Sequence, residues 1–321
     1  MTRRGWLLFA ALSVIWGIPY LLIKIAVTDV DPLIVAFGRT LIGALLLLPI
    51  ALHRRALGPV FRRWKVLLVY TVVEISGPWL LLGHAETRLT SSTAGLLLAV
   101  VPMIAAIILT VTGHDRFDAR RIVGLLVGFA GVAFLVGLDI RLDDLFAVGL
   151  VMVVAVGYAV GPIIIARRLA DLPPIGVVTA SLIVAAVLYA PFTALAGPVR
   201  LTADAAWSIA GLGVICTAVA FLVFFALIAE AGPARATVIT YINPAVAITL
   251  GVLLLNEPLT AGMAVGFPLV ILGSVLATAR VRNRPRTPRT VAAGGAVEAG
   301  GAVPTPQSGP AATGEPAPRS S

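Results

Sequence analysis

Charged side chains are scarce in this sequence of 321 residues. They make up 12% of the chain, about half the share of an ordinary soluble protein, whereas hydrophobic residues make up 59%. A soluble domain with so few charges could not cover its apolar side chains with a polar surface. The composition therefore excludes a soluble protein and predicts an integral membrane protein that crosses the bilayer many times.

Cysteine and lysine are almost absent, which limits the chemistry open to the chain. The one cysteine, Cys216, lies inside an apolar run, which excludes a disulfide framework and a cysteine-rich metal site. The two lysines, Lys24 and Lys65, do not follow a glycine-rich phosphate-binding loop, so we expect no ATP hydrolysis by this chain. The sequence predicts no enzyme: no catalytic residue, no metal and no cofactor.

Long apolar runs make up most of the chain. A transmembrane helix needs about 20 mostly apolar residues, and the runs do not alternate as the strands of a membrane barrel would. We interpret the first run as a span and not as a cleavable signal, because it is of full length and carries Lys24. The predicted spans are residues 6–27, 33–52, 66–83, 91–112, 120–138, 145–165, 174–195, 207–229, 236–255 and 260–280.

Basic residues are distributed unevenly over the loops between these spans. One alternate set of loops carries 18 Lys and Arg residues and the other set carries 3. Cytoplasmic loops hold such an excess, so we expect both termini in the cytoplasm, an even number of spans and a location in the cell (inner or plasma) membrane. This asymmetry accounts for the net charge of +9, and no nucleic acid partner is expected.

The last 41 residues differ in kind from the rest. Residues 281–321 contain seven prolines and six glycines and few large apolar side chains. Such a segment cannot bury enough apolar surface to offset the entropy lost on ordering. The sequence predicts a disordered cytoplasmic tail.

The chain resembles itself at an offset of 142 residues without a gap. Each copy holds five spans, and since five is odd the second copy enters the membrane from the opposite side. Inverted repeats of this kind are common in secondary transporters. We therefore predict an all-α integral membrane protein, with ten transmembrane helices as two inverted five-helix repeats, residues 1–138 and 139–280. Aligned pairs include Trp16 and Tyr158, Pro32 and Pro174, Pro102 and Pro244, and Asp115 and Glu257.

Several short motifs are found in the two halves of the chain. They are Trp16-Gly17, Pro32 followed by Arg39, Ala85 through Pro102, Ala236 through Pro244, and Asn256-Glu257-Pro258. Together they resemble EamA-type transporters of the drug/metabolite transporter superfamily over residues 6–280. The resemblance implies ten helices and the export or exchange of small metabolites, without identifying a substrate. Asp115, where the family usually has Glu, and Glu74 depart from the pattern.

Glu74 and Arg39 are charged residues inside predicted spans. A carboxylate at bilayer depth costs at least about 2.5 kcal/mol, so Glu74 is expected to face a cavity or a partner. It is a candidate for proton coupling or for binding a cationic substrate group; the alternative is an ion pair with Arg39 or Lys24. Arg39 is a candidate for binding an anionic substrate, and the alternatives are the same pair or contact with the external surface. We expect Lys24 to extend to that surface.

Several aromatic and polar residues also lie deep in predicted spans. Trp16, Tyr158 and Tyr241 lie deeper than an interfacial belt, which is consistent with lining a cavity or with packing inside the bundle. Thr240 and Asn243 add polar groups beside Tyr241 and are further candidates for the substrate or ion pathway.

Four prolines are candidates for helix breaks or hinges: Pro19, Pro78, Pro102 and Pro244. A proline frees backbone carbonyls that need other partners. Breaks at matching places in two repeats, as at Pro102 and Pro244, point to a transport site; the alternative is a tolerated kink.

Charged residues near predicted span ends are interpreted more simply. We expect His84 and Glu86 to be solvated at the external end of the third span, with a gating role as the alternative. Asp115 and Glu257 are expected to be charge anchors at the ends of spans four and nine.

These observations predict a secondary active transporter that moves a small metabolite (an amino acid, a drug-like compound or a related solute) outward by alternating access. Proton coupling through Glu74 is part of this hypothesis. The alternatives are a lipid flippase or channel on the same scaffold and, less favoured, a membrane-embedded lipid-modifying enzyme. The expected partners are a small-molecule substrate, protons and membrane lipid. A monomer and a homodimer are both compatible with the sequence.

Overall fold

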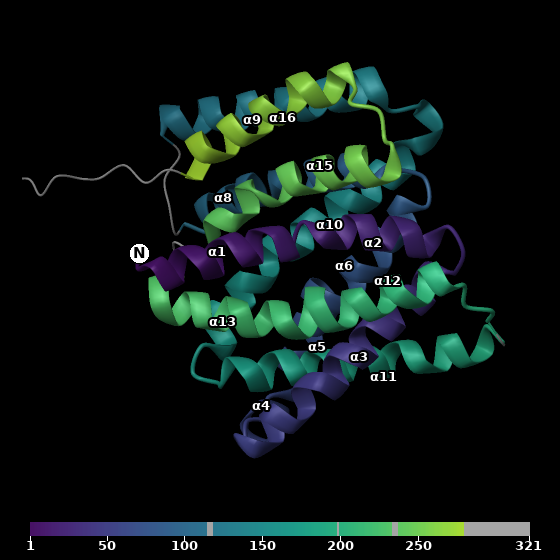
Figure 1. Cartoon of the computed structure of the whole chain (residues 1–321). Helices are drawn as coiled ribbons and strands as arrows, with labels where there is room; N and C mark the ends of the chain where they lie inside the picture. The colour runs from purple at the N-terminus through teal and green to yellow at the C-terminus, as the bar shows by residue number, and fades with distance from the viewer. Residues whose placement is uncertain (114–117, 198, 233–236, 279–321) are drawn as a thin grey trace, which may run out of the picture. The chain divides into compact units, whose positions relative to one another are not determined.

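The computed structural model describes residues 1–278 except 114–117, 198 and 233–236 (Figure 1). The predicted tail, residues 281–321, and Asp115 lie outside the described residues. The described part consists of helices and their connections, without a strand. Ten helical stretches are long and apolar enough to cross a membrane. The predicted all-α membrane fold with ten spans is therefore confirmed.

Most of the spans are not single regular helices. Spans three, six and eight each contain a stretch of π-helix, and spans four and nine contain a 3-10 turn. The elements are α1 (Arg3–Ile15), α2 (Ile18–Val27), α3 (Pro32–His53), α4 (Leu57–Phe61), α5 (Trp64–Tyr70), η1 (Thr71–Ser76), α6 (Gly77–Glu86), α7 (Ser91–Leu97), η2 (Leu98–Val100), α8 (Val101–Val111), α9 (Ala119–Asp139), η3 (Leu142–Asp144), α10 (Leu145–Ile164), η4 (Ile165–Leu169), α11 (Pro174–Leu195), α12 (Ala203–Gly213), η5 (Val214–Val219), α13 (Ala220–Ala231), η6 (Thr237–Tyr241), α15 (Asn243–Leu255) and α16 (Ala261–Thr278).

Helix boundaries repeat along the chain at the offset seen in the sequence. The helices α3 and α11 begin at Pro32 and Pro174 and have 22 residues each. The starts of α9 and α16, and those of α8 and α15, also differ by 142 residues. The N-caps match as well: Asp118 accepts a hydrogen bond from a backbone N–H three residues on, and Thr260 does the same at the start of α16. One five-span scaffold is thus built twice.

Equivalent helices of the two repeats pack against each other in antiparallel orientation. In Figure 1, α9 lies along α16, and the glycines of this pair bring the backbones together. A Cβ on Gly124 would meet Ala277, and a Cβ on Gly131 would meet Val270, so residue numbers rise along one helix as they fall along the other. The pair α3 and α11 is antiparallel too, because Gly43 in the middle of α3 faces Leu182, whereas Gly176 at the start of α11 faces Ala56, just beyond the end of α3.

The apolar side chains are used on both the inside and the outside of the bundle. Large residues such as Phe146, Leu195 and Trp207 are more than three-quarters exposed, as expected of a surface that faces lipid. Buried side chains form two large clusters. Tyr158 of α10 packs against both clusters and so marks where they meet.

Candidate functional site

Arg39 of α3 is buried in the bundle, with 7% of its surface exposed. Its guanidinium carbon lies 3.6 Å from the centre of the Trp79 ring, a cation–π arrangement. Its Nε donates a hydrogen bond of 3.0 Å to Oγ1 of Thr217. Arg39 therefore does not extend to the external surface, which was one sequence-based alternative; it is fixed between α6 and η5.

Two of the three π-helices, η1 and η5, provide the backbone around this arginine. A π-helix is a rare distortion that occurs frequently at functional sites. In η5, Thr217 receives the Arg39 hydrogen bond and donates its own hydroxyl to the carbonyl of Leu212 at 2.8 Å. In η1, the carbonyl of Ser76 accepts a hydrogen bond from the Tyr189 hydroxyl. Spans three and eight thus present polar atoms to the same region from opposite repeats.

Tyrosines surround the buried arginine. Tyr158 contacts Trp79 and interacts electrostatically with Arg39. Tyr20 of α2 and Tyr189 of α11 also interact with Arg39. Of the residues proposed from sequence, the structure thus brings Arg39 and Tyr158 together, whereas the sequence did not single out the other contributors. Their signal in the sequence was weak: each is an aromatic residue within a span rather than at its end.

Glu74 lies within η1 and faces α10. Its Oε2 is buried and has no hydrogen-bond partner in the described structure, and a Cβ on Gly161 would overlap this oxygen. Among the described residues, neither Arg39 nor Lys24 lies within ion-pair distance of it. The ion pair considered from sequence is therefore not formed, and Glu74 is an uncompensated carboxyl group that interacts with Tyr158.

The remaining aromatic and polar candidates contact other side chains. Trp16 packs on Phe221 and Phe224, with ring centres 6.1 and 5.0 Å apart. The Tyr241 hydroxyl forms a 2.6 Å hydrogen bond with that of Thr278. In the orientation that satisfies its neighbours, the Asn243 side-chain nitrogen donates to the carbonyls of Ser13 and Ile239 at 3.2 and 3.0 Å. Thr240 lies one residue before Tyr241 in η6. These contacts join α1, α13, η6 and α16, and a role in the pathway stays a prediction.

The four proposed hinge prolines occupy one kind of position. Pro19, Pro78, Pro102 and Pro244 are each the second residue of a helical segment, namely α2, α6, α8 and α15. At this position the missing N–H would have no partner within the helix. The prolines therefore stand where spans one, three, four and nine change their helical geometry. Hinge motion at these points stays a prediction.

A second cluster of polar residues lies where α6 connects to α7. Lys24 does not extend to the surface but donates hydrogen bonds to the carbonyls of Glu86 and Leu89, at 2.7 and 2.9 Å. The expectation of a solvated Glu86 is wrong: this residue is 0% exposed, and α6, which it ends, packs against α2, α3, α7 and α10. His84, two residues earlier, is exposed as expected.

Glu257 anchors the same connection from the other repeat. Its carboxylate accepts hydrogen bonds from the backbone N–H groups of Ser91 and Ser92, at 2.8 and 3.0 Å, and from the Ser92 hydroxyl at 2.5 Å. A negative charge at the N-terminus of α7 satisfies N–H groups that have no helical partner. The expected charge anchor thus takes the form of a helix cap that crosses between the repeats.

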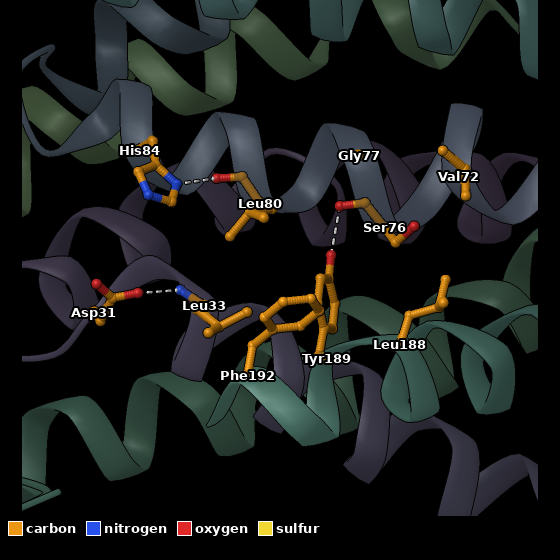
Figure 2. Close-up of a pocket in the computed structure, with 10 residues that line it drawn as sticks. All are labelled: Asp31, Leu33, Val72, Ser76, Gly77, Leu80, His84, Leu188, Tyr189 and Phe192. Atoms are coloured by element: carbon orange, nitrogen blue, oxygen red, sulfur yellow. Dashed lines mark hydrogen bonds between the residues drawn. The ribbon is translucent and has the colours of Figure 1, made fainter. Parts of the chain in front are cut away.

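A groove of about 460 Å³ opens between α6 and α11. In Figure 2 the Tyr189 hydroxyl reaches Ser76 within this groove, with the apolar side chains of Leu188 and Phe192 on the same helix. Asp31 and His84 lie together at one end. The groove is therefore apolar along most of its length and polar at one end. Tyr189 belongs both to this groove and to the group around Arg39.

The described residues contain no group of three His, Cys, Asp or Glu side chains able to hold a metal ion. The arrangement around Arg39 is a candidate binding site, because it combines a fixed positive charge, aromatic faces and hydroxyl groups inside an apolar bundle. Such sites hold small molecules through a few well-placed polar groups.

Comparison with known proteins agrees with this architecture. The uncharacterized transporter YvbV of Bacillus subtilis (strain 168) is 28% identical over 276 residues, which cover 84% of this chain and 89% of the relative. The uncharacterized inner membrane transporter YedA of Escherichia coli (strain K12) is 26% identical over 277 residues, which cover 84% of this chain and 88% of the relative. One crystal structure shares the fold, with a TM-score of 0.63 and 21% identity over 85% of this chain and 97% of that chain.

A family comparison covers both repeats separately. The EamA-like transporter family matches residues 3–137 and again residues 145–279. These two matches coincide with the two five-span units of the structure. The chain belongs to the EamA-like transporter family.

Proposed function

We propose that this protein is a secondary active transporter that moves a small metabolite out of the cell, with the substrate bound beside Arg39. The observation that carries the proposal is the buried arginine, which is stacked on Trp79 of the third span and held by Thr217 of the eighth. A buried charge is costly to stability, and charged residues inside transmembrane segments mark substrate and ion pathways.

Alternating access is supported by the relation between the repeats. Equivalent helices pack antiparallel, which is the arrangement that a two-fold axis perpendicular to the helices produces. We infer that residues 1–138 and 139–280 are inverted repeats, with both termini in the cytoplasm as the distribution of basic residues indicates. Two such halves can rock about a central site and open it to either side.

The chemistry of Arg39 favours a substrate with an anionic group. Only its Nε makes a hydrogen bond to another described residue, so the two terminal nitrogens are left to form a fork that fits a carboxylate. Trp79 and Tyr158 offer aromatic faces to the rest of the molecule. An amino acid or a related carboxylate-bearing solute fits this set of groups.

Glu74 is the proposed coupling residue. An ionised carboxylate without a donor is costly inside a membrane protein, whereas a protonated one is not. Binding and release of a proton at Glu74 would therefore change the charge next to the substrate site. The unpartnered Oε2 and the contact with α10 support this role.

Purified protein in vesicles with an imposed pH gradient tests the proposal, with candidate amino acids as the solutes. We expect solute movement that follows the gradient and that loses its pH dependence in Glu74→Gln. Asp204→Asn, at an exposed acid in the first turn of α12, is the matched control and is expected to behave as wild type. Gradient-driven movement that is unchanged in Glu74→Gln would defeat the coupling role.

The groove between α6 and α11 favours one alternative, a lipid flippase. Its apolar wall with a polar end matches the shape of a lipid with its headgroup at the membrane surface. Transfer of a fluorescent lipid between the leaflets of the same vesicles, without any amino acid transport, would select this alternative.

A further inference from the structure

Glu86 is the least solvated carboxyl group described in the chain, and neither of its oxygens has a hydrogen-bond partner there. It ends α6, twelve residues after Glu74 and therefore about 18 Å farther along the same span. At the offset of the repeat its counterpart is Ile228, and the counterpart of Lys24 is Ala166. The scaffold itself therefore does not require a charged pair at this place.

The charged and titratable groups that face Glu86 come from four other elements. They are Tyr20 and Lys24 on α2, Arg39 on α3, Tyr158 on α10 and Glu257 before α16. Nearby on its own connection, His84 is exposed and Arg88 pairs with Asp144 at 3.8 Å. Of the two cations that act on Glu86, Arg39 is stacked on Trp79, whereas Lys24 is held, among the described residues, by backbone carbonyls alone.

Lys24 nevertheless does not pair with the Glu86 carboxylate. Its ammonium group donates to two backbone carbonyls of the α6–α7 connection, one of which belongs to Glu86 itself. An ionised carboxylate left without a donor beside an available ammonium would cost several kcal/mol, whereas a protonated carboxyl avoids most of this cost. The observed geometry is that of a neutral carboxyl group beside a cation bound elsewhere.

We propose that Glu86 is a proton-binding site, separate from Glu74, and that Lys24 replaces the proton when it leaves. In the protonated state the ammonium binds the carbonyls of Glu86 and Leu89. In the deprotonated state the O–H bond of Glu86 is broken, its proton passes to water, and the Lys24 ammonium turns to the carboxylate. The net charge of the Glu86–Lys24 pair thereby falls from +1 to 0, and the ammonium moves from the two carbonyls to the carboxylate.

This exchange has a mechanical consequence at the α6–α7 connection. In the protonated state Lys24 holds the connection through two carbonyls, while Glu257 of the second repeat caps the helix that follows. Release of the carbonyls would leave the Glu257 cap and the partly exposed Arg88–Asp144 pair as the described polar contacts of this connection with the second repeat. Binding of the proton at Glu86 would thus change how firmly the α6–α7 connection is held against the second repeat. A role of this change in transport rests on the proposed function, whereas proton binding at Glu86 does not.

Infrared difference spectroscopy of the full-length protein in lipid nanodiscs tests the site without a substrate. The carbonyl-stretch band of protonated carboxyl groups is followed through a pH titration. Glu86→Gln is expected to remove one component of this band, and Glu74→Gln, the matched control, is expected to retain that component. In Glu86→Asp the component is expected to persist at a shifted frequency, which keeps the test open if Glu86→Gln folds poorly.

The role of Lys24 has its own expected result. In Lys24→Met the carboxylate loses its counter-ion, so the pH at which the Glu86 component disappears should rise by about 1–3 units. A Glu86→Gln spectrum identical to that of wild type, or a component indifferent to Lys24→Met, would overturn the proposal. If vesicles show no transport while the component titrates as expected, the proposed function fails and the proton site stands.

Discussion

The two repeats share a scaffold and differ in chemistry. Residues at matching positions are Arg39 and Ser181, Trp79 and Phe221, and Glu74 and Cys216. The contact of Tyr158 with Trp79 has its counterpart, 142 residues away, in the packing of Trp16 on Phe221. In the Tyr158–Trp79 pair an arginine, Arg39, is stacked on the Trp79 ring, whereas the Trp16–Phe221 pair is apolar. The comparison teaches that duplication supplied the framework, whereas one repeat supplies most of the buried charge.

The links between the repeats follow the same pattern. Arg39 from span two bonds to Thr217 in the π-helix of span eight, and Tyr189 from span seven bonds to Ser76 in the π-helix of span three. Each repeat thus places a side chain of its second helix on the distorted third helix of the other. The two links join equivalent pairs of spans, but they are not made at matching positions, since the counterpart of Tyr189 is Leu47, and only one of them bears a charge.

The largest effect is expected where the symmetric scaffold itself is broken. In Gly131→Leu a side chain would meet backbone atoms of Val270 and Gly266 below 3.0 Å, so α9 and α16 would have to separate. We expect a loss of about 3 kcal/mol or more in stability, and little folded protein. Gly137→Leu in the same helix, where nothing lies within 4 Å, is the control. Equal thermal unfolding of both variants in detergent would contradict the tight pairing of these helices.

A large effect on transport alone is expected at Arg39. Arg39→Met keeps the bulk but removes the charge, so substrate affinity should fall by about 2 kcal/mol, or roughly 30-fold. The melting temperature should stay equal or rise, because a buried charge is removed. Ser181→Ala, at the matching position, should leave transport unchanged. A fall in melting temperature with intact transport would make Arg39 a structural residue.

A moderate effect on stability alone is expected at the counterpart of Glu74. Cys216 is 1% exposed, and Cys216→Ala should cost about 1 kcal/mol of stability through lost packing. Its transport and the pH dependence of transport should match wild type, in contrast to Glu74→Gln. Thermal unfolding and vesicle transport check the two parts. If transport by Cys216→Ala lost its pH dependence, the proposed difference between η1, which carries the coupling residue, and η5, which does not, would be refuted.

The smallest effect is expected at a pair of matching surface aspartates. Arg63 donates two hydrogen bonds of 2.7 Å to Asp171, and they hold the pKa of that carboxyl below its usual value. Asp29, its counterpart, accepts instead from the Thr202 hydroxyl. The Arg63 pair stabilises the protein above the unfolded pKa of about 3.9, and this contribution is lost as the pH falls through the lower folded pKa.

For Asp171→Asn we therefore expect a decrease in melting temperature of less than about 1 °C at neutral pH, since exposed ion pairs contribute little. The difference should vanish in acid. Asp29→Asn, which removes no ion pair among the described residues, is the control variant. A decrease that grows as the pH falls would show that the sign is wrong.

Much of the fold was predictable because a membrane-spanning helix is recognised from a run of apolar residues alone. Ten apolar runs indicated the spans, which are present in the structure, and the 142-residue offset recurs in the helix boundaries. The π-helices were not predicted. Their sequences, such as Thr71–Ser76, have no pattern that separates them from ordinary helix, because the distortion is stabilised by partners such as Tyr189 that lie far away in the chain.

The candidate site was predictable only in part. Arg39 and Glu74 stood out because charge inside an apolar run is rare. Trp79 and Tyr189 did not stand out, since an aromatic residue in a span is equally consistent with packing. Glu86 was misjudged because its position at the end of a span indicated solvent, whereas the helices packed around α6 leave it 0% exposed.

The sequence by itself determined that the chain crosses the membrane ten times and that it is built from two related halves. These properties depend on local apolarity and on spacing, which every segment carries independently of the rest. Only the tertiary structure decided which charges are compensated: Arg39 by an aromatic ring and a hydroxyl, Glu257 by a helix N-terminus, and Glu86 by no described side chain. The physical reason is that the cost of a buried charge depends on its neighbours in space, and these come from the opposite repeat as often as from its own.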